Sequence, residues 1–192
     1  ARDYVKQTQI ENLTLNIGID EKRAREICQE MTLQWRDDYT QEARSITSSR
    51  VTELENRLLP KMEAVDGALR AFADPSFQLL LVKAQKAAAA TERPADYDLL
   101  SELLIHRFQK GDNRIARAGI NRAVEIVDVI SDDALRGLTV FHAVANFIPE
   151  AANIYQGLDT LNDLFGKLLY SNNLPTGNDW LDHLEVLDAI RV

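Results

Sequence analysis

The chain has 192 residues, of which 45% are hydrophobic and 27% are charged. This balance is typical of a folded globular chain with one sizeable core, and it excludes a disordered protein. The formal net charge of −8 disfavours broad contact with phosphate backbones, which need a basic face. We therefore do not expect nucleic acid as a partner.

The single cysteine, Cys28, cannot close an intrachain disulfide. It lies in an amphipathic pattern, where a free cysteine behaves as a small buried hydrophobe, and this favours a reducing, cytoplasmic setting. The apolar run FQLLLV is far shorter than the roughly 20 residues that span a bilayer, and the polar start of the chain is not a signal peptide. We expect no membrane contact. The missing initial Met and the abrupt end at LDAIRV are compatible with a fragment of a longer protein.

Residues 10–19 alternate apolar and polar side chains, which predicts a β-strand. Its apolar face carries Leu13, Leu15, Ile17 and Ile19. No second alternating segment of similar length follows, so the backbone hydrogen bonds of this strand would be completed by another copy of the chain or by a partner. We therefore predict that residues 1–19 form an oligomerisation lead-in and that the protein is a homo-oligomer.

From Asp20 almost to Pro60, apolar residues recur every three or four positions. This spacing predicts one long helix over residues 20–59, or two helices joined near SITSSR. Asp20 suits the N-cap. Paired strands would bring the helices of several copies together, so the expected interface also includes Ile27, Met31 and Trp35.

Residues 61–192 contain further helical periodicities, separated by prolines and by Asp or Ser caps. The fold predicted is all-α: a multi-helix bundle with a long N-terminal helix preceded by one short β-strand. The segment DDALRGLTVFHAVANFI is apolar around most of its circumference and is expected at the centre of the core. Residues expected to be largely buried are Trp35, Leu138, Phe141, Val144, Phe147, Leu161, Leu164, Phe165 and Leu168.

Asp179 and His183 are weak metal candidates, because ligands four residues apart on a helix can chelate one cation. Two ligands are too few for catalysis, and the alternative is that Asp179 is an N-cap or first-turn acid beside a partly exposed His183. We interpret His142, in TVFHAVANF, as a hydrogen-bonded core histidine rather than a catalytic one. No cofactor is predicted.

One local cluster of positive charge follows the first helix and is a candidate anion-binding group, although exposed arginines on a solvated face explain it as well. It comprises Arg107, Lys110, Arg114 and Arg117. The sequence has no Walker loop, no G-x-G-x-x-G after a strand, no G-x-S-x-G elbow and no C-x-x-C. Local patterns therefore do not indicate an enzyme.

Three stretches, LTLNIGIDEKRAREICQEM, GINRAVEIVDVISDDALRGLTVFHAV and GLDTLNDLFGKLLYSNNLPTGNDWLDHLEVLDAIR, resemble an uncharacterised bacterial protein family. Its members look alike in that each has a strand with the pattern I-x-I-G near its start, followed by a long helix and a helical body. The resemblance implies a bacterial cytosolic origin and family members that continue beyond LDAIR, and it transfers no activity. Such lead-ins also look like those of multidomain bacterial defence or conflict proteins.

Two main functions follow as hypotheses, and nucleic-acid binding through Arg107, Lys110, Arg114 and Arg117 is a third, less favoured possibility. The first is a non-enzymatic interaction and oligomerisation module of a bacterial cytosolic protein, with a link to a defence or conflict system. The alternative is a ligand-binding or metal-dependent enzyme domain, with its site among the C-terminal helices near His142, Asp179 and His183.

Overall fold

The computed structural model describes residues 19–36, 40–110, 113–169 and 174–190, and within these ranges it contains helices and no strand. The all-α prediction is confirmed, whereas residues 10–18 of the predicted strand lie outside the described ranges. The elements, in chain order, are α1 (Glu21–Trp35), α2 (Gln41–Glu63), the 3-10 helix η1 (Ala68–Ala73), α3 (Pro75–Ala90), α4 (Pro94–Gln109), α5 (Arg114–Ile126), α6 (Asp132–Asn146), α7 (Ile154–Leu169) and α8 (Asp179–Val186).

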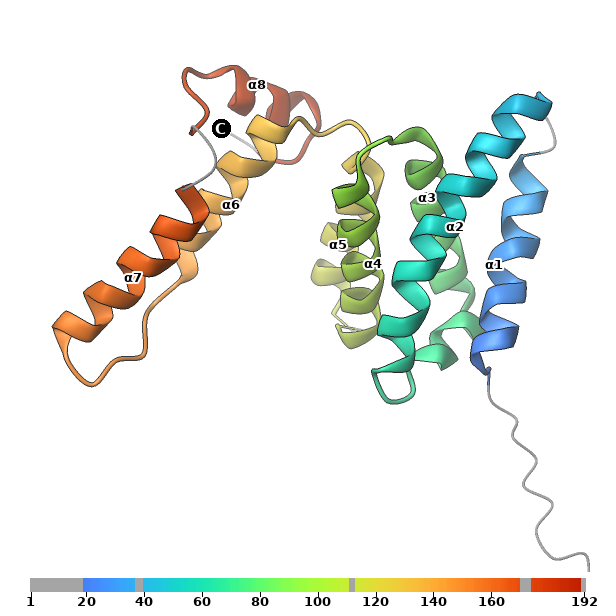
Figure 1. The fold of residues 1–192 in the computed structure, drawn as a ribbon, viewed down its shortest axis with the longest axis horizontal. Helices are drawn as coiled ribbons and strands as arrows, with labels where there is room; N and C mark the ends of the chain where they lie inside the picture. The colour runs from blue at the N-terminus through green and yellow to red at the C-terminus, as the bar shows by residue number, and fades with distance from the viewer. Residues whose placement is uncertain (1–18, 37–39, 111–112, 170–173, 191–192) are drawn as a thin grey trace, which may run out of the picture.

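The single long helix predicted over residues 20–59 is wrong, because α1 and α2 are separate helices that pack side by side (Figure 1). Each has its own N-cap: Asp20 Oδ1 accepts the Arg23 N–H at 2.8 Å, and the Thr40 hydroxyl accepts the Ala43 N–H. The serine- and threonine-rich stretch where a joint was expected lies inside α2. Thr47 is buried there, so tertiary packing outweighs the low helix propensity of this stretch.

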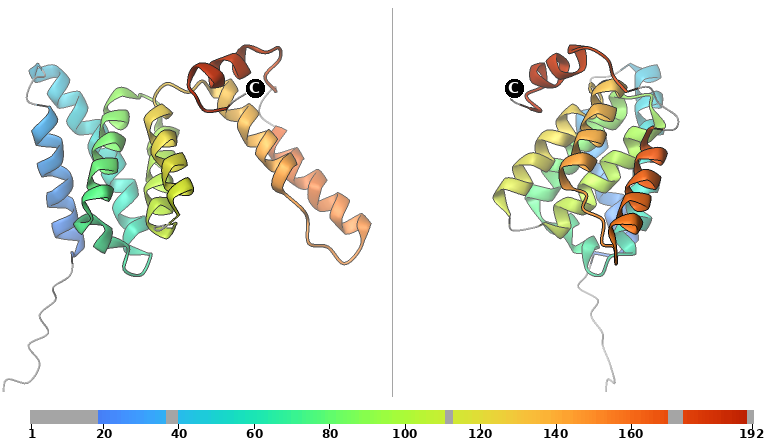
Figure 2. Two further views of the ribbon diagram at one scale, coloured as in Figure 1. Left: turned by 180° about the vertical axis from the view of Figure 1, so that it is seen from behind. Right: turned by 90° about the vertical axis from the view of Figure 1, so that its left-hand side faces the viewer.

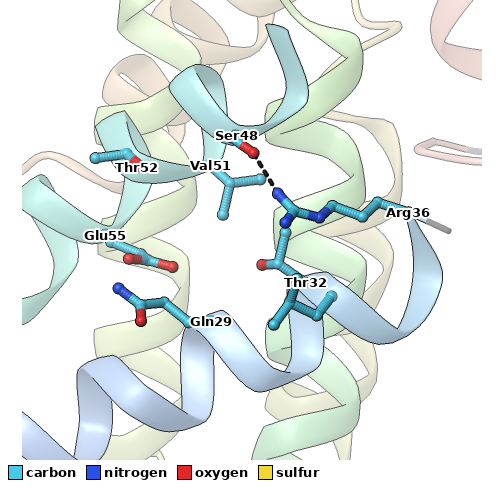
Figure 3. Close-up of a pocket in the computed structure, with 8 residues that line it drawn as sticks. Gln29, Thr32, Arg36, Ser48, Val51, Thr52 and Glu55 are labelled. Atoms are coloured by element: carbon cyan, nitrogen blue, oxygen red, sulfur yellow. Dashed lines mark hydrogen bonds between the residues drawn. The ribbon is translucent and has the colours of Figure 1, made fainter. Parts of the chain in front are cut away.

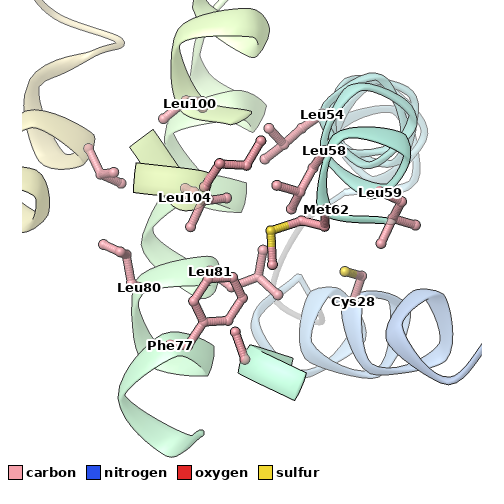
Figure 4. Close-up of a cluster of buried hydrophobic side chains, with 14 of the residues drawn as sticks. Cys28, Leu54, Leu58, Leu59, Met62, Phe77, Leu80, Leu81, Leu100 and Leu104 are labelled. Atoms are coloured by element: carbon pink, nitrogen blue, oxygen red, sulfur yellow. The ribbon is translucent and has the colours of Figure 1, made fainter. Parts of the chain in front are cut away.

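Helices α1 to α5 and η1 form a closed bundle, which we call the bundle (residues 19–127). Helices α2, α3 and α4 pack on one another, α1 covers α2 and α3, and α5 covers α3 and α4 (Figures 1 and 2). The side chains at its centre lose all or nearly all contact with water (Figure 4): Leu54, Leu58, Leu59, Met62, Phe72, Phe77, Leu81, Leu100 and Leu104. The rings of Phe72 and Phe77 meet edge to face, with centroids 5.3 Å apart.

Cys28 lies in this core, fully buried as the sequence predicts. Burial raises the pKa of its thiol well above the usual range, so the sulfur is a neutral packing atom. The turn between α2 and η1 requires a glycine, because Gly67 has a φ of +73°.

Helices α6, α7 and α8 project away from the bundle (Figure 1), so the expectation that α6 is central in the core is wrong. A second, smaller apolar cluster of Ile130, Ala134 and Leu184 joins α6 to α8. Helix α8 approaches α6 so closely at Trp180 that position 137 requires a glycine. A Cβ at Gly137 would overlap the Trp180 ring. The prediction failed because an apolar helix face indicates that burial is favourable, but it does not indicate which element covers that face.

Substitutions of Phe72 in the bundle and of Phe141 in the projecting helix α6 test whether only the bundle has a closed core at these positions. Phe72 is fully buried, so Phe72→Ala should lower the free energy of unfolding by on the order of 3 to 5 kcal/mol. Phe141 is 69% exposed, so Phe141→Ala should cost less than about 1 kcal/mol in the monomer. Urea unfolding at dilute protein concentration measures both, and equal losses would place Phe141 in a core.

Candidate interaction surface

The polypeptide from α6 through α7, residues 132–169, forms an arm that exposes large apolar side chains. More than half of the exposed large hydrophobic residues of the described chain lie between residues 141 and 174. Seven of them, 42% to 85% exposed, make up what we call the apolar arm surface: Phe141, Val144, Phe147, Ile148, Ile154, Tyr155 and Leu158. Apolar patches of this extent are uncommon on monomers and mark interaction sites.

Helical spacing brings the members of this surface that lie within α6 or α7 together, whereas Phe147 and Ile148 follow the end of α6. Along α7, apolar residues at Ile154, Leu158, Leu161, Phe165 and Leu168 repeat every three or four positions. Gly157 is the one buried residue of α7, and its neighbours within 4 Å are in the preceding loop. The described chain therefore leaves Ile154 and Leu158 exposed and covers the other three residues of this stripe only in part.

The expectation that the apolar residues of α6 and α7 are core is corrected by their accessibility. Phe141, Val144 and Phe147 are exposed. The others are half-buried: Leu138, Leu161, Leu164, Phe165 and Leu168. The periodicity identified the apolar face correctly, but the bundle closes without it.

Both histidines proposed for the C-terminal helices have structural surroundings. His142 is exposed rather than buried, and its ring Nδ1 lies 3.2 Å from the Asn146 amide nitrogen. His183 Nε2 accepts the Ser131 N–H at 3.1 Å, so the lone pair that a metal would need is occupied. Asp179 stands in the first turn of α8, as the alternative interpretation predicted. Within the described ranges, no group of three His, Cys, Asp or Glu side chains could hold a metal ion.

Arg93, which sequence patterns did not single out, joins the arm to the bundle. Its Nη2 donates to the Val127 carbonyl and its Nη1 to the Ile130 carbonyl, each at 2.8 Å. Nη1 also lies 2.8 Å from Asp132 Oδ1, and Nε lies 3.0 Å from the buried Asp96 carboxylate. These contacts fix the segment from which α6 starts.

The predicted strand interface can be placed only in part. Leu13, Leu15 and Ile17 lie outside the described residues, as does the side chain of Trp35. Ile19 is half-buried against the bundle core. The helix residues Ile27 and Met31, the first buried and the second half-buried, line a groove of about 490 Å³ between α1 and α3.

The predicted cationic cluster is divided by the fold. Arg107 is buried and Arg117 is half-buried, and both line one cleft together with Arg70 of η1. Lys110 and Arg114 are exposed and do not line it. Arg70 lies so far from the others in sequence that only the helix packing brings it to this place.

A second concavity, of about 270 Å³, lies between α1 and α2 (Figure 3). Arg36 donates from Nη1 to the Ser48 hydroxyl at one end, and the carboxyl group of Glu55 faces the Gln29 amide at the other. Glu55 is 4% exposed, and burial raises the pKa of its carboxyl to about 7, although the charge of Arg25 opposes the shift. The group therefore changes charge near neutral pH.

Residues 18–190 match the model of a protein family with the description ":-like". The chain belongs to this family, whose description states no activity, ligand or partner, so membership of an uncharacterised family is confirmed. No curated protein and no solved structure matches the chain. Among the described residues, no helix is long and apolar enough to cross a membrane.

Glu55 should make stability depend on pH. Its pKa is raised from 4.5 to about 7 on folding, so its contribution is complete below pH 4.5 and is lost as pH rises through 7. The free energy of unfolding should fall by about 2 to 3 kcal/mol from this group between pH 4.5 and 8. In Glu55→Gln this loss should disappear in urea titrations, whereas Glu53→Gln, at an exposed position of the same helix, should retain it. Equal pH profiles for the wild type and Glu55→Gln would contradict the assignment.

Proposed function

We propose that this chain is a non-enzymatic interaction and oligomerisation module that self-associates through the apolar arm surface. The exposure of that surface carries the proposal. Its seven side chains present on the order of 1,000 Å², since an aromatic side chain alone carries about 150 to 250 Å². A stable interface buries about 800 Å² on each partner, so one surface of this size suffices.

A second copy is the partner that fits this surface best. In a two-fold arrangement, α7 of one copy lies on α6 of the other, and four amphipathic helices close a common apolar centre. The acidic residues Asp159 and Asp163 are displaced by more than a quarter turn from the stripe that contains Leu158 and Phe165. A contact made by this stripe therefore does not bury these two carboxylates, whose desolvation would oppose association.

The biological setting and the N-terminal strand belong to the same proposal. The resemblance to a bacterial family supports a cytosolic bacterial protein and a link to a defence or conflict system. Residues 10–19 supply a second element of association, in which strands of different copies pair. The arm and the strand emerge from different parts of the chain, so they can act independently.

A charged residue in the apolar arm surface should abolish association. Leu158→Asp should elute with the mass of the 21.7 kDa monomer in light scattering at tens of micromolar, because the aspartate would be desolvated at the interface. Ile46→Asp is the matched control: Ile46 is 52% exposed on α2, against 56% for Leu158 on α7, and this variant should keep the wild-type mass. A monomeric wild type under these conditions would refute the proposal.

Deleting residues 1–18 separates the two elements of association. The shortened chain retains the whole arm, so it should still be at least dimeric, with unchanged helicity by far-UV circular dichroism. If the full chain forms a larger oligomer than the shortened chain, the difference in mass measures the contribution of the strand. If the shortened chain is monomeric instead, association depends on the N-terminal segment and not on the arm.

A further inference from the structure

A cleft of about 340 Å³ is lined by residues of η1, α3, α4 and α5. The parts of these helices that line it lie at the end of the bundle opposite to the one from which α6 leaves (Figure 1). Here η1 and the start of α3 meet the end of α4 and the first turns of α5. The lining residues are Arg70, Ala71, Asp74, Phe77, Arg107, Phe108 and Arg117. The proposed self-association does not use this cleft.

Arg107 is built into the wall of the cleft. Its side chain is 7% exposed, its Nη2 donates to the Ser76 hydroxyl at 2.8 Å, and it lies 3.9 Å from Asp74 Oδ2. Asp74 caps α3, accepting the N–H and the hydroxyl of Ser76 at 2.9 Å. These bonds, with smaller contributions from the charges of Arg107 and Arg117, lower the pKa of the Asp74 carboxyl. The carboxylate is therefore ionised, and both of its oxygens accept hydrogen bonds.

The cleft carries an excess of positive charge in a chain whose net charge is −8. Three arginines, the exposed Arg70, the half-buried Arg117 and the buried Arg107, line the cleft with one carboxylate, so its lining carries a net charge of two positive units. Within the described ranges, neither Arg70 nor Arg117 forms an ion pair at hydrogen-bonding distance. Each guanidinium has five N–H donors in a fixed planar fork, so this cleft offers many donors and few acceptors.

We propose that this cleft binds a small phosphate monoester. A phosphate dianion matches the two excess charges, and its oxygens accept the paired N–H groups of arginine in bidentate geometry. Phe108 is half-buried and lines the cleft beside the arginines, where the organic group of an ester can pack on the accessible part of its ring. The cleft volume falls in the range of small-molecule sites, about 300 to 1,000 Å³.

Titration calorimetry with phenyl phosphate at low salt tests the site on the full-length protein. Arg117→Gln and Arg70→Gln should each weaken binding by about tenfold, as expected for the loss of one charge-assisted contact. Arg114→Gln removes the same charge one turn earlier on α5, from an exposed position outside the cleft, and should change affinity by less than about twofold. Far-UV circular dichroism verifies that the variants fold.

Asp74→Asn provides a test by gain of affinity. Asparagine is an equally good N-cap, so α3 keeps its start, while one negative charge leaves the cleft. Affinity for phenyl phosphate should rise by about threefold to tenfold, which is the effect of one charge several ångströms from the ligand. The proposal is overturned if 5 mM phenyl phosphate gives no saturable binding, if Asp74→Asn binds no tighter, or if Arg114→Gln weakens binding as much as Arg117→Gln.

Inorganic phosphate tests the binding of the anion separately from the packing of the organic group. It lacks the organic group, so it should bind more weakly than phenyl phosphate and compete with it for the same arginines. Competition that Arg117→Gln weakens supports the anion part of the site. Equal affinities for the two ligands would overturn the role of Phe108 in packing against the organic group.

Discussion

The course of the chain beyond the bundle depends on one guanidinium group, that of Arg93. Two of its nitrogens donate to the carbonyls of Val127 and Ile130, just after α5, where a helix end leaves acceptors without intrahelical partners. A positive charge at this position is also favoured by the helix dipole. The carboxylates of Asp96 and Asp132 hold the same group from the bundle and from α6. This contact orients the start of the arm, while Gly137 and Trp180 fix α8 on it.

The bundle closes without the arm, and this determines which surfaces remain for binding. Leu54, Leu58 and Leu104 already fill the space between α2 and α4. Because protein interiors are close-packed, no room is left for the apolar faces of α6 and α7. Among the described residues, the exposed side chains of the arm therefore have no cover, and the proposed self-association would supply it. The arginine cleft lies at the far end of the same closed bundle, so a bound anion and a second copy of the chain would not compete.

Local signals in the sequence were reliable wherever one short-range interaction decides the outcome. Asp20, Asp74 and Ser131 cap helices as their positions predict, because the side chain reaches a backbone N–H two or three residues away. Cys28 is buried, as its neighbours indicated. The expected site residues fared differently: Arg107 and Arg117 share a cleft, but their companion Arg70 could not be found without the packing of η1 against α4.

The sequence by itself determined that the chain is helical, which face of each helix is apolar, and where most helices begin, since periodicity and capping act over a few residues. Only the tertiary structure decided that α1 and α2 are separate, that Phe141 and His142 face water, and that Arg93 connects two apolar clusters. An apolar stripe has the same pattern whether its own chain or another copy covers it. Burial is a property of the whole packing arrangement, to which residues 30 to 60 positions apart contribute equally with near neighbours.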